Sequence, residues 1–172
     1  MKKTLAISTL IFAFLNNLEG QSSYYGKVES AYLKYVYRTV RVDPGPNWQG
    51  YNLQNKQNGY TIAVTNGLCF ADRKVFTGLG LGYLNFEGLH GVSILSDLEY
   101  ADSKTKLAPL LNLKIGYNHL WNQYDGGRST PHFEMNVGFK YRLKEKTAVY
   151  FKSGFIVTQQ ALLVPFIIGI RY

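Results

Sequence analysis

Few residues in this chain have the types and spacing that chemistry requires. The chain has three histidines, His90, His119 and His132, and a single cysteine. His132 and Glu134 lie two residues apart on one face of a predicted strand, which suggests a pair of metal ligands, but zinc requires three or four. We therefore expect both side chains to join a hydrogen-bonded network, with no metal and no other cofactor. A single cysteine excludes an internal disulfide and a multi-cysteine metal site.

A histidine near a membrane surface can act as a general base for a serine nucleophile. We place His119 near the outer end of a predicted strand. Ser129 falls in a predicted loop and Ser96 near the middle of a strand, so neither is expected beside His119. A histidine that hydrogen-bonds to lipid headgroups accounts for the same position. We predict no catalytic residue, and we do not expect an enzyme.

A repeat of two residues dominates the chain from Tyr24 onward and indicates β-strands. Strands of roughly 10–14 residues are longer than the five or six typical of soluble sheets. They match the roughly 9–11 tilted residues that cross a bilayer. The eight predicted strands cover residues 24–40, 59–71, 74–86, 91–101, 107–121, 131–143, 146–158 and 162–172.

The connections between these segments differ in length in a regular way. Those after the second, fourth and sixth strands are short and charged, whereas those after the first and fifth, residues 43–58 and 122–130, are long. Short turns on one rim and longer loops on the other are typical of a membrane barrel. The chain is therefore predicted to be all-β, an eight-stranded antiparallel up-and-down transmembrane β-barrel.

Charge distribution predicts which face of each strand meets lipid. The more apolar face of the second to eighth strands carries no charged residue. A lipid-facing Lys or Arg at the membrane midplane costs roughly 2–4 kcal/mol, and unpaired charges in a dry soluble barrel would be costly too. We therefore expect the charged face to line the lumen and to close it against general diffusion. The predicted lumen charge network is Lys114, Glu134, Lys140, Arg142 and Lys152.

The first strand is harder to orient because both of its faces are mixed. We assign Lys34 and Arg38 to the inner face, opposite Ala31 and Leu33, and count Lys27 and Glu29 as a cancelling pair. The formal net charge is +8. The excess falls on the inner face and the short turns and not on the long loops. This placement argues against a nucleic-acid partner.

The first twenty residues differ from the rest. A basic start is followed by an apolar run from Leu5 to Leu15 and then by a polar stretch that ends at Gly20. This order is typical of a secretory signal peptide, and the apolar run is too short to span a membrane as a helix. We predict a signal peptide at residues 1–20 and a barrel domain at 21–172, exported to the cell outer membrane.

Several short motifs carry a family resemblance. In order, they are Gly78-Leu-Gly-Leu-Gly-Tyr83, Asp97-Leu-Glu-Tyr100, Pro109 and Lys114-Ile-Gly-Tyr117. The chain resembles the small eight-stranded outer-membrane β-barrels, including the OmpA- and OmpX-like barrels, and within them the Bacteroidota-type outer-membrane β-barrel domain family. The resemblance implies a structural or surface-interaction role among outer-membrane lipid and lipopolysaccharide.

The end of the chain adds to the resemblance. Tyr172 is a terminal aromatic residue, and Ile170 lies two positions before it on the same strand face. Together they resemble the C-terminal assembly signal of outer-membrane barrels. The resemblance implies that the barrel-assembly machinery is a partner during biogenesis.

The best candidate for binding is the first long loop. Trp48 and Tyr51 are rigid contact residues, and the neighbouring prolines limit the entropy cost of ordering the loop. They are the candidate contacts for an unknown extracellular partner, and an ordinary solvated loop is the alternative that accounts for the same residues. Two other functions stay open: a lipid A-modifying barrel enzyme, and a secreted soluble β-barrel that binds a small apolar ligand.

Overall fold

The chain folds into eight long strands. A computed structural model describes residues 22–38, 58–86, 89–102, 105–121, 128–158 and 161–172. Within these ranges no helix is long and apolar enough to span a membrane. The strands are β1 (Ser23–Arg38), β2 (Gly59–Phe70), β3 (Val75–Phe86), β4 (Leu89–Ala101), β5 (Leu107–Trp121), β6 (Arg128–Arg142), β7 (Ala148–Thr158) and β8 (Ala161–Arg171).

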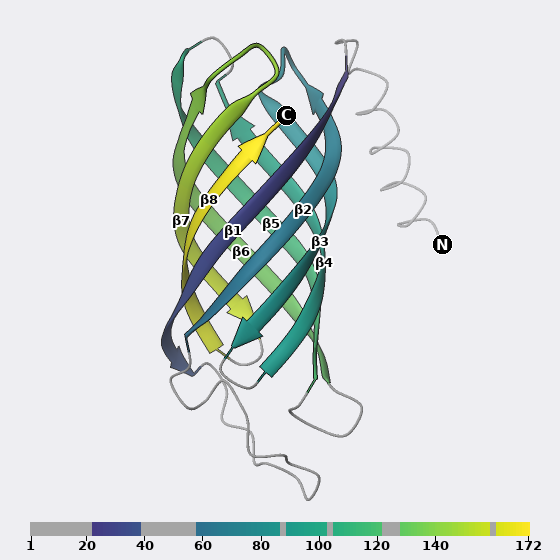
Figure 1. The fold of residues 1–172 in the computed structure, drawn as a ribbon, viewed down its shortest axis with the longest axis vertical. Helices are drawn as coiled ribbons and strands as arrows, with labels where there is room; N and C mark the ends of the chain where they lie inside the picture. Colours follow the sequence, from purple (N-terminus) through teal and green to yellow (C-terminus); the bar gives the residue numbers. More distant parts are fainter. Residues whose placement is uncertain (1–21, 39–57, 87–88, 103–104, 122–127, 159–160) are drawn as a thin grey trace, which may run out of the picture.

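The strands close into a barrel in chain order (Figure 1). Each strand pairs antiparallel with the next, and β8 returns to pair with β1. Because closure leaves no free sheet edge, the backbone groups can pair between strands, as a bilayer requires. The predicted eight-stranded antiparallel barrel is confirmed.

The predicted strand boundaries agree with the structure to within three residues. β5 covers the predicted residues 107–121, whereas β6 begins at Arg128, three residues before the predicted start at Pro131. The ladder between β5 and β6 runs on to Leu120 opposite Arg128. Pro131 is exposed and lies inside β6. A proline has no N–H to donate, but it can stand within a strand at a position where the ladder does not need that donor.

The two ends of the barrel differ. The short turns after β2, β4 and β6 lie at the same end as the C-terminus (Figure 1). In the turn between β2 and β3, Ala71, Asp72 and Arg73 have φ angles of 50°, 56° and 66°. This left-handed backbone is uncommon outside glycine. In this turn the Lys74 backbone N–H donates a hydrogen bond to the Ala71 carbonyl oxygen, with 3.2 Å between the nitrogen and the oxygen.

Large apolar side chains cover the outside of the barrel wall. Leu79, Leu81, Ile94, Val137 and Ile168 are each more than 60% exposed. Burial alternates along the strands, so their neighbours in sequence point inward. The predicted orientation, apolar face out and charged face in, is confirmed for β2 to β8.

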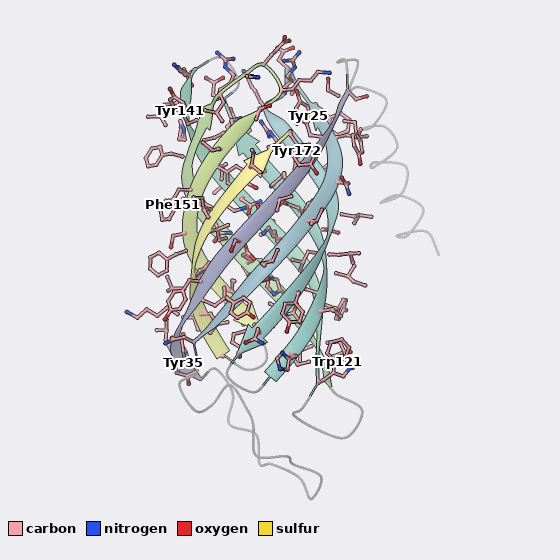
Figure 2. The ribbon with its side chains drawn as sticks, viewed as in Figure 1. Tyr25, Tyr35, Trp121, Tyr141, Phe151 and Tyr172 are labelled. Atoms are coloured by element: carbon pink, nitrogen blue, oxygen red, sulfur yellow. The ribbon has the colours of Figure 1, made fainter. Side chains whose placement is uncertain are left out.

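Aromatic side chains lie at both ends of this apolar surface. Figure 2 shows Tyr141 and Tyr172 toward the short-turn end and Trp121 toward the opposite end, and all three are exposed. Rings at these levels meet the lipid headgroups of both leaflets, as in the aromatic girdles of membrane barrels.

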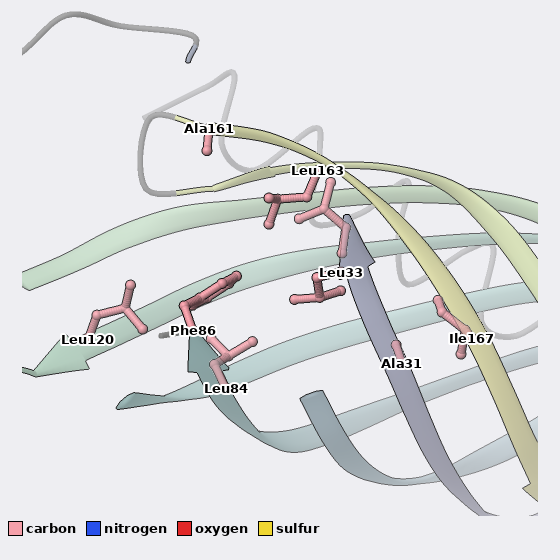
Figure 3. Close-up of a cluster of buried hydrophobic side chains, with 9 residues drawn as sticks. Ala31, Leu33, Leu84, Phe86, Leu120, Ala161, Leu163 and Ile167 are labelled. Carbon is pink, nitrogen blue, oxygen red and sulfur yellow. The ribbon is translucent and has the colours of Figure 1, made fainter. Parts of the chain in front are cut away.

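An apolar cluster lies inside the barrel toward the end opposite the short turns. Figure 3 shows its side chains. We call it the apolar plug. It forms because inward-facing positions near these strand ends hold Leu, Ile, Phe and Ala in place of charged residues. Its members are Ala31, Leu33, Leu84, Phe86, Leu120, Ile156, Ala161, Leu163 and Ile167.

The phase predicted for β1 is wrong. Lys34 is exposed, whereas Ala31 and Leu33 are buried in the apolar plug. Lys27 and Glu29 stand in the same phase as these two residues and are also buried. Apolarity alone could not orient this strand, because its inner face changes from charged to apolar along its length.

Candidate functional site: the lumen ion network

Glu29 is the centre of a buried group of charges in the lumen. Its carboxylate contacts the ammonium groups of Lys114 and of Lys152, the latter at 2.7 Å. The Tyr150 hydroxyl donates to the same carboxylate at 2.8 Å. A charged carboxylate with three donors is well satisfied, although it is only 3% exposed. Strands β1, β5 and β7 therefore converge on one residue.

Lys27 links Glu29 to two acids of β4. Its Nζ is 2.8 Å from Asp97, 2.6 Å from Glu99 and 3.5 Å from Glu29. Arg171 of β8 donates to Glu99 at 3.2 Å. Lys27 is fully buried, so these partners replace the water that an ammonium group otherwise needs.

The network continues through amides to Glu134. Asn112 donates to Asp97 at 2.6 Å and accepts from Lys152 at 2.6 Å. Glu134 lies 3.2 Å from Lys114 and accepts from Asn136 at 2.6 Å. These contacts connect β4, β5, β6 and β7 across the lumen.

His132 belongs to the same polar layer. Its Nε2 is 3.2 Å from Glu134, and its Nδ1 is 3.0 Å from the amide nitrogen of Asn118. Both ring nitrogens are therefore engaged in the lumen network. No group of three or more candidate metal ligands occurs in the part of the chain that the structure describes.

We define the ion network by its ion-paired members. Among the described residues it contains equal numbers of cations and carboxylates, so its formal charge is zero when all are ionised. The cations are Lys27, Lys114, Lys152 and Arg171, and the carboxylates are Glu29, Asp97, Glu99 and Glu134. Mutual pairing explains how eight charges can occupy one narrow lumen.

The predicted lumen residues lie in three different surroundings. Lys114, Glu134 and Lys152 are buried members of the ion network. Lys140 is also buried, but its Nζ hydrogen-bonds to no described atom. Arg142 is exposed, because β6 ends at the short-turn rim, and it lines the mouth of the lumen together with Lys140.

Two central members of the network are not predicted from the sequence pattern. The sequence predicts only that the charges of Lys27 and Glu29 cancel, yet Glu29 contacts more of the network's cations than any other carboxylate described. The sequence does hold a signal for their orientation, because Lys27 and Glu29 alternate with the outward-facing Tyr24, Val28 and Tyr32. The exposed tyrosines mark the outer face of β1, so the odd-numbered charges must face inward.

Little space remains between the ion network and the apolar plug. A cavity of about 20 Å³ lies there, lined by Glu29, Lys114 and Glu134 on one side and by Leu33 and Ile167 on the other. This is about the space of one water molecule. The arrangement holds charges in fixed pairs and leaves no room here for a substrate.

A second polar group lies on the outer rim. Ser129 is part of β6 and pairs with His119 of β5, with 2.9 Å between the His119 Nδ1 and the Ser129 hydroxyl oxygen. The prediction that no serine lies beside His119 is wrong, because β6 starts earlier than its apolar pattern indicates. The Trp121 ring packs edge-on against His119 at 5.2 Å between ring centres.

The terminal residues continue the barrel wall. Tyr172 exchanges two backbone hydrogen bonds with Gly26, at 2.8 Å and 2.9 Å, and Ile170 pairs with Val28. Both Ile170 and Tyr172 are exposed on the apolar outer face. Their recognition by the assembly machinery stays a prediction.

Two further predictions lie outside the described residues. The loop residues Trp48 and Tyr51 and the signal peptide at 1–20 fall in ranges for which the structure describes nothing.

These features define the class of the protein. An apolar outer surface bounded by aromatic residues, around a lumen that holds the charges, is the inverse of a soluble barrel, so the apolar face meets lipid. The chain is a transmembrane β-barrel of eight strands.

Comparison with solved structures agrees with this class. Neisserial surface protein A (NspA) has a TM-score of 0.63 at 11% sequence identity, covering 87% of this chain and 97% of that protein. The N-terminal β-barrel domain of Pseudomonas aeruginosa OprF has a TM-score of 0.53 at 13% identity, covering 88% and 100%. No protein-family profile and no curated protein matches the chain.

At sequence identities of 11% and 13%, the similarity to these structures shows a shared fold and no more. The chain has the fold of the small outer-membrane β-barrels, and its apolar belt agrees with the predicted location in an outer membrane. The finer resemblance to the Bacteroidota-type family stays a prediction.

Proposed function

We propose that the chain is a closed outer-membrane barrel with a structural or surface-interaction role, and not a general diffusion pore. The ion network and the apolar plug, stacked along the lumen, are the observation that carries this proposal. An eight-stranded barrel is only wide enough for its side chains to fill it. A hydrated ion would have to displace both layers to pass.

Conductance tests the closed lumen. In a planar lipid bilayer, the folded protein should give no stepwise current above that of the protein-free membrane, because the apolar plug excludes water and the ion network is neutral. A heat-modifiability gel on the same sample establishes that the barrel is folded. Stable conductance steps from folded protein would contradict the proposal.

The outer rim is the surface offered to lipopolysaccharide and to other molecules. Tyr83, Asn85 and His90 form one polar group there, with the Tyr83 hydroxyl 2.7 Å from the His90 Nδ1. Trp48 and Tyr51 are our candidate contacts for an extracellular partner. A variant with alanine at both Trp48 and Tyr51 should still fold, as shown by the heat-modifiable gel shift. It should lose any binding by which cells with the wild-type protein exceed cells that lack it.

One observation favours a second function, hydrolysis or transfer of a lipid acyl ester. The hydrogen bond between His119 and Ser129 places a base beside a hydroxyl on the outer face of the wall, near the loop-side rim. Nucleophilic serines usually have a third group that orients the base. No carboxylate among the described residues contacts His119, and we therefore keep the structural or surface role first.

Lipid A analysis separates the two functions. Mass spectra of lipid A from cells with the wild-type chain, with Ser129→Ala and without the chain should show the same acylation, because no acid among the described residues orients the His119–Ser129 pair. An acyl chain that is lost or gained only with the wild-type protein would overturn the first function and establish the second.

A further inference from the structure

We propose that the short-turn mouth of the barrel binds a compact oxyanion, a phosphate or phosphomonoester, at Lys140. A hollow of about 430 Å³ opens at this end, within the size range of small-molecule sites. Its lining is rich in cations. They are Arg73, Lys140, Arg142, Lys144, Lys146 and Arg171.

Lys140 is the residue that points to a ligand. It lines the hollow, its side chain is nearly inaccessible at 4% exposure, and its Nζ hydrogen-bonds to no atom in the described ranges. A buried ammonium group without a partner is costly, and buried polar groups in proteins nearly always have one. An anion in the hollow would supply this partner.

No described carboxylate hydrogen-bonds to the Lys140 Nζ, although Glu99 and Asp102 are near enough to act on its charge. The four carboxylates of the ion network are bound by that network's four cations, including Arg171, which donates to Glu99 at 3.2 Å. Of the acids that line the hollow, Glu145 is bound by Arg73 at 2.9 Å. Among the described residues, six cations and three acids line the hollow, which gives a formal charge of +3.

The chemistry of this lining selects the ligand class. Ammonium and guanidinium groups are strong donors to phosphate oxygens, and a concave site with charges of one sign concentrates ions of the opposite sign. The hollow exceeds the size of a single phosphate, so a phosphomonoester with its bound water fits as well.

The position of the hollow favours a soluble ligand over a lipid headgroup. It is lined by inward-facing residues, Tyr25, Lys140 and Arg171, whereas lipid contacts the outward-facing residues between them. The barrel wall therefore separates the hollow from the surrounding lipid. A headgroup could reach Lys140 only by bending over the rim.

Calorimetric titration tests the proposal on the whole barrel in nanodiscs of zwitterionic lipid. Inorganic phosphate is the probe, with chloride at the same ionic strength as reference. Wild-type protein should bind phosphate saturably, and Lys140→Met should weaken binding at least about tenfold, the effect of losing one charged hydrogen bond. Lys74→Met removes a lysine near the same rim that does not line the hollow, and binding should stay within about twofold.

Two controls keep the result interpretable. Lys140→Met removes an unpaired buried charge, so its thermal unfolding midpoint should equal or exceed that of wild type, and Lys140→Arg should retain phosphate binding. Equal binding by wild type and Lys140→Met, or no preference for phosphate over chloride, would overturn the proposal. Loss of phosphate binding when phosphatidylglycerol is added to the nanodisc would overturn a soluble ligand in favour of a headgroup.

Discussion

Replacing Glu29 with glutamine should lower the free energy of unfolding by about 3–5 kcal/mol, the usual cost of breaking a buried ion pair from one side. Glu29 is the carboxylate partner of Lys152, which is fully buried and otherwise bound to the neutral amide of Asn112. The substitution keeps the shape of the side chain and removes its charge. It therefore leaves an ammonium group in the lumen without a counter-charge.

Denaturant unfolding of the barrel in lipid vesicles, followed by tryptophan fluorescence, measures this loss. The matched control is Glu145→Gln, which breaks the exposed pair with Arg73 at the short-turn rim and should cost no more than about 1 kcal/mol. Similar small losses for both variants would mean that the ion network tolerates an unpaired lysine. The neutral, mutually paired lumen inferred above would then be wrong.

Replacing Ile94 with arginine should cost about 2–4 kcal/mol in lipid vesicles, because a charge near the middle of the lipid face must enter the hydrocarbon. Ile94 lies near the centre of β4, is 62% exposed and faces Leu81 across the ladder. In a soluble barrel the same substitution at an exposed position would change stability by no more than about 0.5 kcal/mol. The experiment thus measures whether this surface meets lipid or water.

Leu143→Arg is the depth control for this measurement. Leu143 is 53% exposed just beyond the end of β6 at the short-turn rim, where an arginine should cost about 0–1 kcal/mol. Equal costs at the two positions, or solubility of the wild-type protein without detergent, would contradict the membrane assignment.

Local alternation was enough to predict much of this molecule. In β5, Leu111, Ile115 and Tyr117 alternate with Asn112 and Lys114 so regularly that the bounds, the outer face and the inner face are all predicted from the sequence and found in the structure. The period of two is a property of the extended backbone, so it needs no knowledge of neighbouring strands. The class of fold and the side that meets lipid follow from the same pattern.

The tertiary structure alone determined the partners within the lumen and at the rims. Closure of β8 onto β1 sets the stagger that brings Glu29 to Lys114 and Lys152, residues 85 and 123 positions away. The same staggered pairing brings Ser129 to His119. A period of two says which way a side chain points but not how far along the barrel axis it lies. The ion network, the apolar plug and the lysine at the mouth depend on that height, which strand register sets once the barrel has closed.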